Sequence, residues 1–301
     1  MSLNAIISNI ARASLHDGPG VRTVIYFKGC ALRCAWCHNP ETLSAECELA
    51  FLPSKCIGCG RCVALCPSHH AVEKGKIRFL REGCIGCGKC AQNCPTGAFA
   101  LVGEHVDAKH LLGEIKKDQH YYSASGGGVT FSGGECLLQA DFVASVARKC
   151  AEEGIHVAIE TALFVPWENV EKVSPYTNLF LCDLKIADAQ KHRRYTGHGN
   201  ERILENLRRI SEGSVPVVVR IPVIPKVNDG EEDMASFAAV LRTLGNAVLR
   251  VELLKYNTLA ASKYGMIGRE YKAFAKEPQS DAQMQALARE LSLQSGVVCT
   301  V

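Results

Sequence analysis

Apolar runs alternate with amphipathic segments along most of the chain, and this alternation predicts an α/β fold. Short runs rich in β-branched residues predict six strands, at Val21–Phe27, Gly128–Phe131, His156–Ile159, Asn178–Cys182, Val215–Val223 and Leu249–Leu254. The fifth run is almost continuously apolar, as expected for a strand buried on both faces. A 3.6-residue period predicts five helices, at 106–117 with Asp107 as N-cap, Leu137–Glu153, Glu201–Glu212, Asp233–Leu244 and Asp281–Leu293.

Strands that alternate with helices in this way form a parallel sheet with right-handed crossovers. About six strand–helix units are visible, which is fewer than the eight of a closed barrel. We therefore predict an incomplete α/β barrel, of the partial (β/α)6 type, formed by residues 1–46 and 104–301. An open doubly wound sheet is the alternative. Residues 47–103 break the alternation and are predicted to be an insert after the first strand.

The insert contains two near-copies of one cysteine pattern, C-x2-C-x2-C-x3-C-P, beginning at Cys56 and at Cys84. This repeat is the bacterial ferredoxin signature, in which the fourth cysteine of each run binds the other cluster. It predicts two [4Fe–4S] clusters, held by Cys56, Cys59, Cys62 and Cys94 and by Cys84, Cys87, Cys90 and Cys66. A tetrahedral zinc site is disfavoured, because it takes two well-separated cysteine pairs.

A third cysteine pattern lies earlier in the chain, where Cys30, Cys34 and Cys37 have the spacing C-x3-C-x2-C. A cubane cluster has four irons, normally all bound by thiolates. This loop offers only three, so one iron would stay open to a ligand that is not protein. An open metal position is typical of catalytic sites, whereas closed positions are typical of structural ones.

Polar residues follow or end most of the predicted strands. Active sites of parallel α/β folds form at these carboxyl ends. The residues concerned are Ser132, Gly133, Gly134, Glu135, Glu160, Thr161, Asp183, Lys185, Arg220, Tyr256 and Asn257. Each segment alone has an ordinary interpretation, such as a glycine turn or a solvated charge pair. Together they suit an amino-acid-like ligand on the open iron. Glu135 would accept from its ammonium, and Lys185 or Arg220 would lie near its carboxylate.

Composition narrows the cellular context. The 301 residues carry a net charge of +3, too small to indicate nucleic-acid or membrane binding. No signal peptide or membrane-spanning run is visible, which predicts a cytoplasmic protein, and we expect a monomer. Of the 16 cysteines, eleven fall in tight runs between residues 30 and 94, so metal ligation is favoured over a disulfide framework.

These motifs resemble those of the glycyl-radical-enzyme activating enzymes, a group within the radical S-adenosylmethionine (SAM) superfamily. The resemblance is carried by the three-cysteine loop with Trp36 before its last cysteine, and by the flanking segments His16–Thr23 and His38–Glu41. Further matches run through essentially the whole chain. The ferredoxin-like insert matches the larger members of the group.

The resemblance implies a fold, a reaction and roles for residues. The fold is a partial (β/α)6 barrel. The open iron is chelated by SAM, whose reductive cleavage yields a 5′-deoxyadenosyl radical that removes hydrogen from a glycine of a partner glycyl radical enzyme. Gly133, Gly134 and Glu135 would bind the methionyl amine. Glu160, Thr161 and Asp183 would form a monovalent-cation site at the carboxylate. The remaining SAM contacts would come from Trp36, Lys185, Arg220 and Asn257, and Asp17 and Gly18 would face the partner's glycine loop.

The two insert clusters could relay electrons from an external flavodoxin or ferredoxin to the three-cysteine loop, because ferredoxin-type potentials suit SAM reduction. A structural brace or a docking surface is the alternative role for the insert. Two other functions stay open at this point. One is a radical SAM enzyme that modifies another peptide or a small molecule, and the other is a non-catalytic electron-transfer protein.

Overall fold

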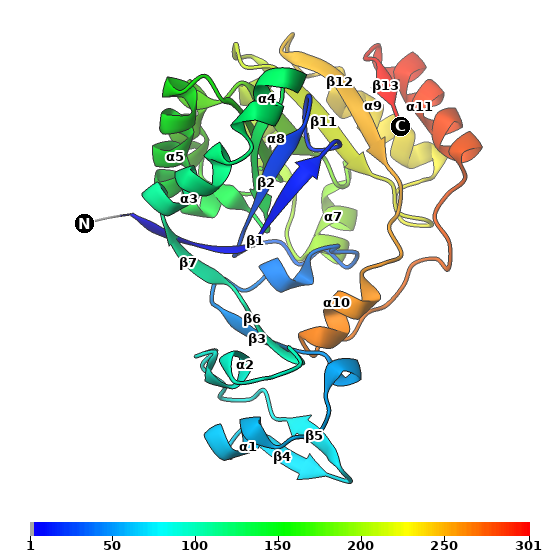
Figure 1. Ribbon diagram of the computed structural model, residues 1–301. Coiled ribbons are helices and arrows are strands. Elements are labelled where there is room, and N and C mark those ends of the chain that lie inside the picture. Colours follow the sequence, from blue (N-terminus) through cyan, green and yellow to red (C-terminus); the bar gives the residue numbers. More distant parts are fainter. Residues whose placement is uncertain (1–2) are drawn as a thin grey trace.

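The computed structural model describes residues 3–301 and is built around one nine-stranded sheet (Figure 1). The strand order is β13-β12-β11-β10-β9-β8-β2-β1-β7. All six predicted strands are present and run parallel in chain order. They are β2 (Arg22–Phe27), β8 (Gly128–Gly133), β9 (His156–Thr161), β10 (Leu179–Asp183), β11 (Val217–Pro222) and β12 (Val248–Leu254).

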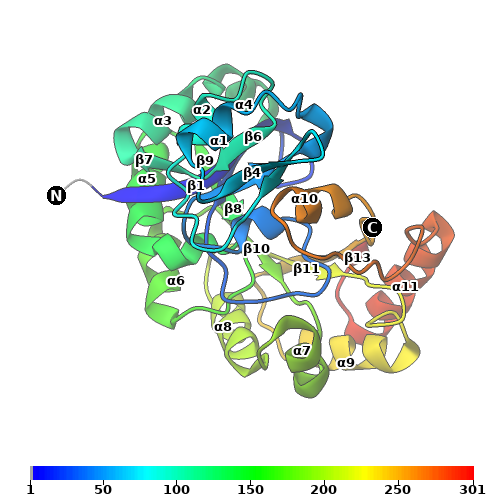
Figure 2. The same ribbon diagram turned by 90° about the horizontal axis from the view of Figure 1, so that it is seen from below.

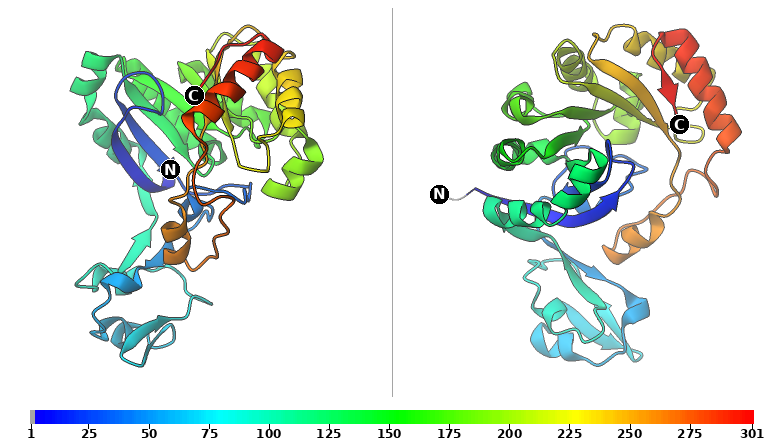
Figure 3. Two further views of the ribbon diagram at one scale, coloured as in Figure 1. Left: turned by 90° about the vertical axis from the view of Figure 1, so that its right-hand side faces the viewer. Right: turned by 45° about the horizontal axis from the view of Figure 1, so that its top comes forward.

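The sheet curves but does not close. Its edges, β7 and β13, are not paired with each other, and Figure 3 shows the gap that remains between the two ends. The order of the six parallel strands never reverses, as it would in a doubly wound sheet. Viewed from below, α5, α6, α8, α9 and α11 follow one another around the outer side of the strands (Figure 2).

Three strands of the nine-stranded sheet were not predicted. They are β1 (Asn4–Ser14), antiparallel to β2, β7 (Glu104–Asp107), antiparallel to β1, and the short β13 (Cys299–Thr300). The insert follows β2, the strand predicted at Val21–Phe27, but β1 precedes that strand, so it is the second of the chain and not the first. The prediction missed β1 because it lies near a sheet edge: only two of its eleven residues, Ala5 and Ile7, are fully buried, so its apolar signal is weak.

The predicted helices are present with small shifts of their ends. They are α3 (Ala108–Lys116), α5 (Ala140–Glu152), α8 (Glu201–Ser211), α9 (Glu231–Leu241) and α11 (Asp281–Ser295). The Asp107 carboxylate accepts from His110 N at 2.7 Å, which confirms the predicted N-cap. Shorter helices were missed, namely α4 (Gln119–Ser125), α6 (Trp167–Val173), α7 (Ala189–Thr196) and α10 (Ala261–Met266). Within residues 3–301, no helix is long and apolar enough to cross a membrane.

Residues 47–103 project from the barrel as a small body (Figure 1). An antiparallel pair, β3 (Glu48–Phe51) and β6 (Phe99–Val102), forms its stem. A hairpin, β4 (His70–Glu73) and β5 (Lys76–Phe79), lies at its far end with α1 (Arg61–Leu65), while α2 (Lys89–Gln92) is nearer the barrel. The body has its own small core, in which the rings of Phe51 and Phe99 stack at 4.5 Å.

Basic side chains fix the junction between this body and the barrel. The buried Lys28 ammonium lies 3.1 Å from Glu48 and donates to the Glu41 carbonyl at 2.9 Å. Arg269 donates to the Pro40 carbonyl at 2.9 Å and pairs with Glu48 at 3.3 Å. Lys28 and Pro40 flank the three-cysteine loop, so the junction lies directly beside that loop.

Candidate active site

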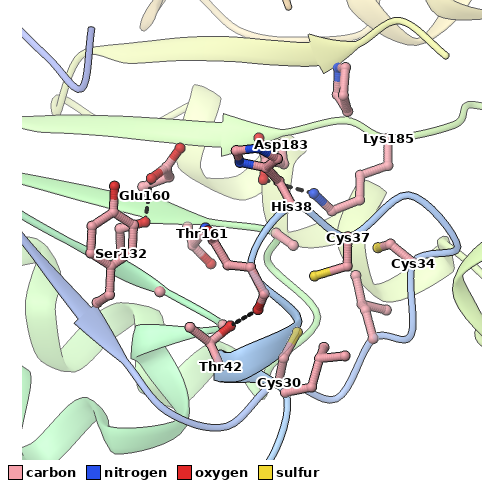
Figure 4. Close-up of a pocket in the computed structure, with 18 of the residues that line it drawn as sticks. Cys30, Cys34, Cys37, His38, Thr42, Ser132, Glu160, Thr161, Asp183 and Lys185 are labelled. Atoms are coloured by element: carbon pink, nitrogen blue, oxygen red, sulfur yellow. Dashed lines mark hydrogen bonds and ion pairs between the residues drawn. The ribbon is translucent and has the colours of Figure 1, made fainter. Parts of the chain in front are cut away.

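A cavity of about 330 Å³ opens at the carboxyl ends of the parallel strands (Figure 4). It brings together most of the predicted site residues: Asp17, Cys30, Cys34, Trp36, Cys37, Gly133, Gly134, Glu160, Thr161, Asp183 and Lys185. Four predicted residues, Gly18, Glu135, Arg220 and Asn257, do not line it. Segments far apart in sequence thus meet in one place, as the strand-end argument predicts.

The three-cysteine loop is held against α7. Arg33 N donates to the Thr196 carbonyl at 2.8 Å, and Ala35 N donates to the Tyr195 carbonyl at 2.9 Å. Trp36 is almost fully buried, with its ring 6.2 Å from that of Tyr195 and 6.1 Å from that of Phe274. The loop therefore has a fixed shape before any ligand binds.

The three thiols in this loop are free, and each of these cysteines is partly buried. Burial raises the pKa of Cys30 to about 12 and those of Cys34 and Cys37 to about 11. In the described part of the chain, no three His, Cys, Asp or Glu side chains converge on a point that could hold a single metal ion. A cubane does not require this convergence, because each thiolate binds a different iron. Three cysteines around one cavity therefore suit a cluster better than a mononuclear site.

Gly133 and Gly134 have a packing role that does not depend on a ligand. Gly133 has φ +121°, and a Cβ there would collide with the backbone of Phe27 in β2. A Cβ on Gly134 would meet the carbonyl oxygens of Gly29 and Thr42, the latter at 2.8 Å. Gly134 N also donates to the Phe27 carbonyl at 2.9 Å. The glycine pair thus lets β8 pass close to the segment that leads into Cys30.

We expect Gly134→Ala to displace the Cys30 loop, because the new methyl group would overlap two backbone carbonyls. Its reconstituted iron content should fall, and its melting temperature should drop by several degrees, corresponding to a loss of about 1–3 kcal/mol. Gly265→Ala is the matched control, since nothing lies within 4 Å of that position. A Gly134→Ala protein that melts and binds iron like the wild type would contradict this interpretation.

Glu135 lies under the cavity floor and is 3% exposed. Its carboxylate accepts from Thr161 Oγ1 at 2.8 Å, from Ala162 N at 3.0 Å and from Leu137 N at 3.2 Å. Burial nevertheless raises the pKa of Glu135 from 4.5 to about 7. A cation nearby would stabilise its ionised form.

Arg220 lies among carboxylates at the centre of the barrel. It is 3% exposed and pairs with Glu160 at 2.8 Å, with Glu252 at 3.0 Å and with Asp17 at 3.8 Å. Its remaining NH2 group donates to the His16 carbonyl. The guanidinium therefore ties the 16–17 turn to β9 and β12. Burial raises the pKa of Glu160, although the charge of Arg220 opposes this shift.

The rest of the cavity wall carries one close ion pair, in which Lys185 Nζ lies 2.9 Å from Asp183 Oδ2. Burial alone would lower the pKa of Lys185, but the Asp183 carboxylate outweighs it, so the pKa rises and the ammonium stays charged. Asn257 is exposed and outside the cavity lining, and its Oδ1 accepts from Leu259 N at 2.8 Å.

Sequence reasoning missed several residues of the site. Tyr26 and Thr42 line the cavity, although no pattern had marked them. His38 and Ser132, which had been marked without an individual role, also line it, and Ser132 Oγ donates to the Glu160 carboxylate. Arg22 lies beneath the turn that carries Asp17. It is fully buried, and its Nε donates to Thr130 Oγ1 at 3.0 Å, which in turn donates to the Asp17 carbonyl at 2.6 Å. The only signal for Arg22 was its place within the His16–Thr23 motif.

Similarity to known proteins identifies the family to which this chain belongs. Residues 24–238 match the family model described as the Radical SAM superfamily. The chain belongs to the radical SAM superfamily. Membership implies one [4Fe–4S] cluster and SAM as cofactors.

Two curated relatives narrow the family further. The chain is 40% identical to the (2S)-3-sulfopropanediol dehydratase activating enzyme of Klebsiella oxytoca, covering 89% of this chain and 86% of that protein. It is also 40% identical to the trans-4-hydroxy-L-proline dehydratase activating enzyme of Clostridioides difficile, covering 95% and 96%. At this identity and coverage, the chain belongs to the same family of activating enzymes.

A solved structure extends the likeness of fold beyond this family. The radical SAM methyltransferase of Sphaerobacter thermophilus matches 98% of this chain and 76% of that protein with a TM-score of 0.54. The sequence identity is 12%, so the match concerns the fold alone.

Five cysteines of residues 47–103 contribute to the small core of that body, namely Cys56, Cys62, Cys84, Cys90 and Cys94, whereas Cys59 and Cys87 are exposed. One small cavity is lined by Cys56, Cys59, Cys62 and Cys94, together with Cys90. Burial would raise the pKa of Cys94, but backbone donors at Phe99, Thr96 and Ala98 outweigh it, so the pKa is lowered. Amide donors to sulfur are typical of the surroundings of iron–sulfur clusters.

Proposed function

We propose that this chain activates a glycyl radical enzyme, with Cys30, Cys34 and Cys37 holding the SAM-binding cluster. The observation that carries the proposal is the cavity where these cysteines meet Gly133, Glu160, Asp183 and Lys185. When bound, the cluster supplies the electron that cleaves SAM to methionine and a 5′-deoxyadenosyl radical, which takes hydrogen from a glycine Cα of the partner. The family of activating enzymes to which the chain belongs supports this reaction.

The roles of individual residues form part of the proposal. The charged Lys185 ammonium in the cavity wall suits the SAM carboxylate. Glu160, Thr161 and Asp183 line one side of the cavity and would hold a monovalent cation there. Trp36 and His38, which line the cavity, would contact SAM together with Asn257, and Arg220 would orient Glu160 beside it. Asp17 lines the cavity, and with Gly18 it would face the glycine loop of the partner.

The insert would hold two [4Fe–4S] clusters that relay electrons toward the three-cysteine loop. The meeting of Cys56, Cys59, Cys62 and Cys94 at one small cavity supports the exchange of the fourth cysteine between the two runs. The junction at Lys28 and Pro40, beside the three-cysteine loop, supports a relay from the insert. The electron source would be a flavodoxin or a ferredoxin.

Glu135 provides a test of ammonium binding at the SAM site: its carboxylate does not itself line the cavity, but it accepts from Thr161 and Ala162, which do, so the proposed contact requires the ammonium to reach past that lining. We expect Glu135→Gln to weaken SAM binding by about 10–100-fold, because a charge-assisted hydrogen bond contributes about 1.5–3 kcal/mol. Isothermal titration of the reconstituted protein would measure this change. Glu290→Gln on α11 is the matched control and should leave the affinity unchanged.

The same variant has a pH signature in the SAM-free protein. The pKa of Glu135 is raised from 4.5 to about 7 in the folded protein, so the folded state retains a proton that the unfolded chain releases. Ionisation of Glu135 therefore lowers the free energy of unfolding as the pH rises from 4.5 to about 7. Glu135→Gln should remove this part of the dependence of the unfolding free energy on pH, as measured by urea unfolding at several pH values. An unchanged slope would show that Glu135 is already ionised.

The function itself is tested anaerobically. The reconstituted protein is mixed with a chemical reductant, SAM and candidate partner enzymes, and the expected result is a glycyl radical doublet in the EPR spectrum. If 5′-deoxyadenosine forms but no candidate partner shows a glycyl radical signal, the chain modifies another peptide or a small molecule. If no 5′-deoxyadenosine forms at all, only an electron-transfer role is left.

A further inference from the structure

The far end of the insert carries exposed positive charge around one exposed cysteine. Cys59 is exposed there, and its neighbour Ile57 is 68% exposed, which is unusual for an isoleucine. We call the surrounding residues the distal patch: Lys55, Ile57, Cys59, Arg61, Lys74 and Lys76. The hairpin tip with Lys74 and Lys76 belongs to it because a Cβ on Gly58 would lie 3.0 Å from the Gly75 carbonyl oxygen.

The positive charge of this patch is not neutralised by nearby acids. Residues 47–103 contain seven Lys and Arg and three Glu, a net charge of +4, whereas the whole chain carries only +3. Two of the three acids are paired, Glu48 with Lys28 and Arg269, and Glu73 with Arg78. All four basic side chains of the patch are exposed, and within residues 3–301 none of them forms an ion pair. Without clusters, the insert polypeptide is therefore basic on a chain that is otherwise slightly acidic. Because each four-thiolate cluster would add negative charge, the positive charge of the distal patch comes from its exposed side chains and not from the net charge of the loaded insert.

The two cysteine loops of the insert lie at different distances from the barrel. The second loop is the nearer one, because a Cβ on Gly86 would touch the Cys47 carbonyl oxygen and one on Gly88 would lie 3.1 Å from Leu101 in the stem. Helix α2 packs on β6 of the stem, whereas α1 packs on β4 of the far hairpin. Figure 1 shows the same order. The path from the distal patch toward Cys30 thus runs through the first loop, then the second loop, then the junction at Lys28.

We propose that the distal patch is the docking site for an acidic one-electron carrier protein. The inference rests on the relay role proposed above and specifies where the electron enters. Transient electron-transfer interfaces are small, and opposite charges on the two proteins steer their association. The patch has an exposed apolar residue, Ile57, surrounded by basic side chains. Exposed Cys59 would place its cluster at the surface beneath the docked carrier. One electron passes from the reduced carrier, which is oxidised, to that cluster, which is reduced, and no bond forms or breaks.

The test compares two charge-matched variants of the reconstituted protein. The first is Lys74→Glu with Lys76→Glu in the patch. The second is Lys89→Glu with Lys109→Glu, two exposed lysines elsewhere that change the net charge equally. Binding of a purified acidic flavodoxin is measured by isothermal titration over a series of salt concentrations. We expect the patch variant to bind at least about tenfold more weakly with a shallower salt dependence, and the control to change by about twofold or less.

Radical formation separates this inference from the proposed function. With a chemical reductant, both variants should generate the glycyl radical like the wild type, whereas with flavodoxin the patch variant alone should be slow. Equal weakening of flavodoxin binding in both variants, or none in either, would overturn the docking site. Self-association of the wild type that the patch variant abolishes would assign the surface to a second copy of the chain instead. If no reductant yields a radical but the binding difference persists, docking stands and the proposed function fails.

Discussion

Cys34→Ala should reduce 5′-deoxyadenosine formation to the level of cluster-free protein, whatever the electron source. Cys34 lies in the middle of the three-cysteine loop, and its thiol lines the cavity. The loop already has one thiolate fewer than a cubane normally receives, so the loss of another leaves only two protein ligands. The measurement is anaerobic SAM cleavage with iron content determined on the same samples.

Cys87→Ala is the informative comparison, because it removes one predicted ligand from the second loop of the insert. With a small chemical reductant, which can reach the SAM-binding cluster directly, it should retain much of the wild-type cleavage, and with flavodoxin it should lose most of it. Cys150→Ala controls for the loss of a buried thiol outside every motif, since Cys150 packs in the barrel core. Equal losses in Cys34→Ala and Cys87→Ala with the chemical reductant would instead indicate that the insert is required for folding.

The barrel could be predicted largely because its strands are buried on both faces. Residues such as Val217, Val218 and Val219 are all fully buried, so their sequence signal is a continuous apolar run. The antiparallel strand β1 gave no such signal, since most of its residues are partly exposed. Short helices such as α7, which is strongly polar and has only His192 and Thr196 buried, also lack a clear apolar period.

The candidate site was predictable to the extent that chain topology alone determines it. Parallel strands bring their carboxyl ends together, and this rule places Glu160, Asp183 and Lys185 in one cavity. The rule says nothing about which side chains pair. Arg220 was predicted to contact SAM, and in the structure three of its N–H groups donate to Glu252, Glu160 and the His16 carbonyl, of which Glu252 had been marked by no motif. Such partners depend on side-chain geometry across the barrel.

Arg220→Met should be among the most destabilising substitutions in the barrel. It removes the cation shared by Glu160, Glu252 and Asp17, three partly buried carboxylates, and leaves Glu160 with a neutral hydroxyl, that of Ser132, in place of its ion pair. Removing one partner of a buried ion pair costs about 3–5 kcal/mol, a large part of the stability of a typical domain. Urea unfolding of the SAM-free protein would measure the loss. Arg208→Met is the control: its ion pairs with Glu205 and Glu212 are on the surface, so stability should hardly change.

The pH dependence of the Arg220→Met defect distinguishes lost charge from lost packing. Without the guanidinium, the pKa of Glu160, already raised by burial, should rise further in the folded state. An acid whose pKa is raised by folding lowers stability as pH increases, so the defect should be smaller at about pH 5 than at about pH 8. Arg220→Lys, which keeps a positive charge but fewer donors, should recover part of the loss at the higher pH. A defect that is equal at both pH values and is not reduced by lysine would mean that Arg220 acts through its packing volume.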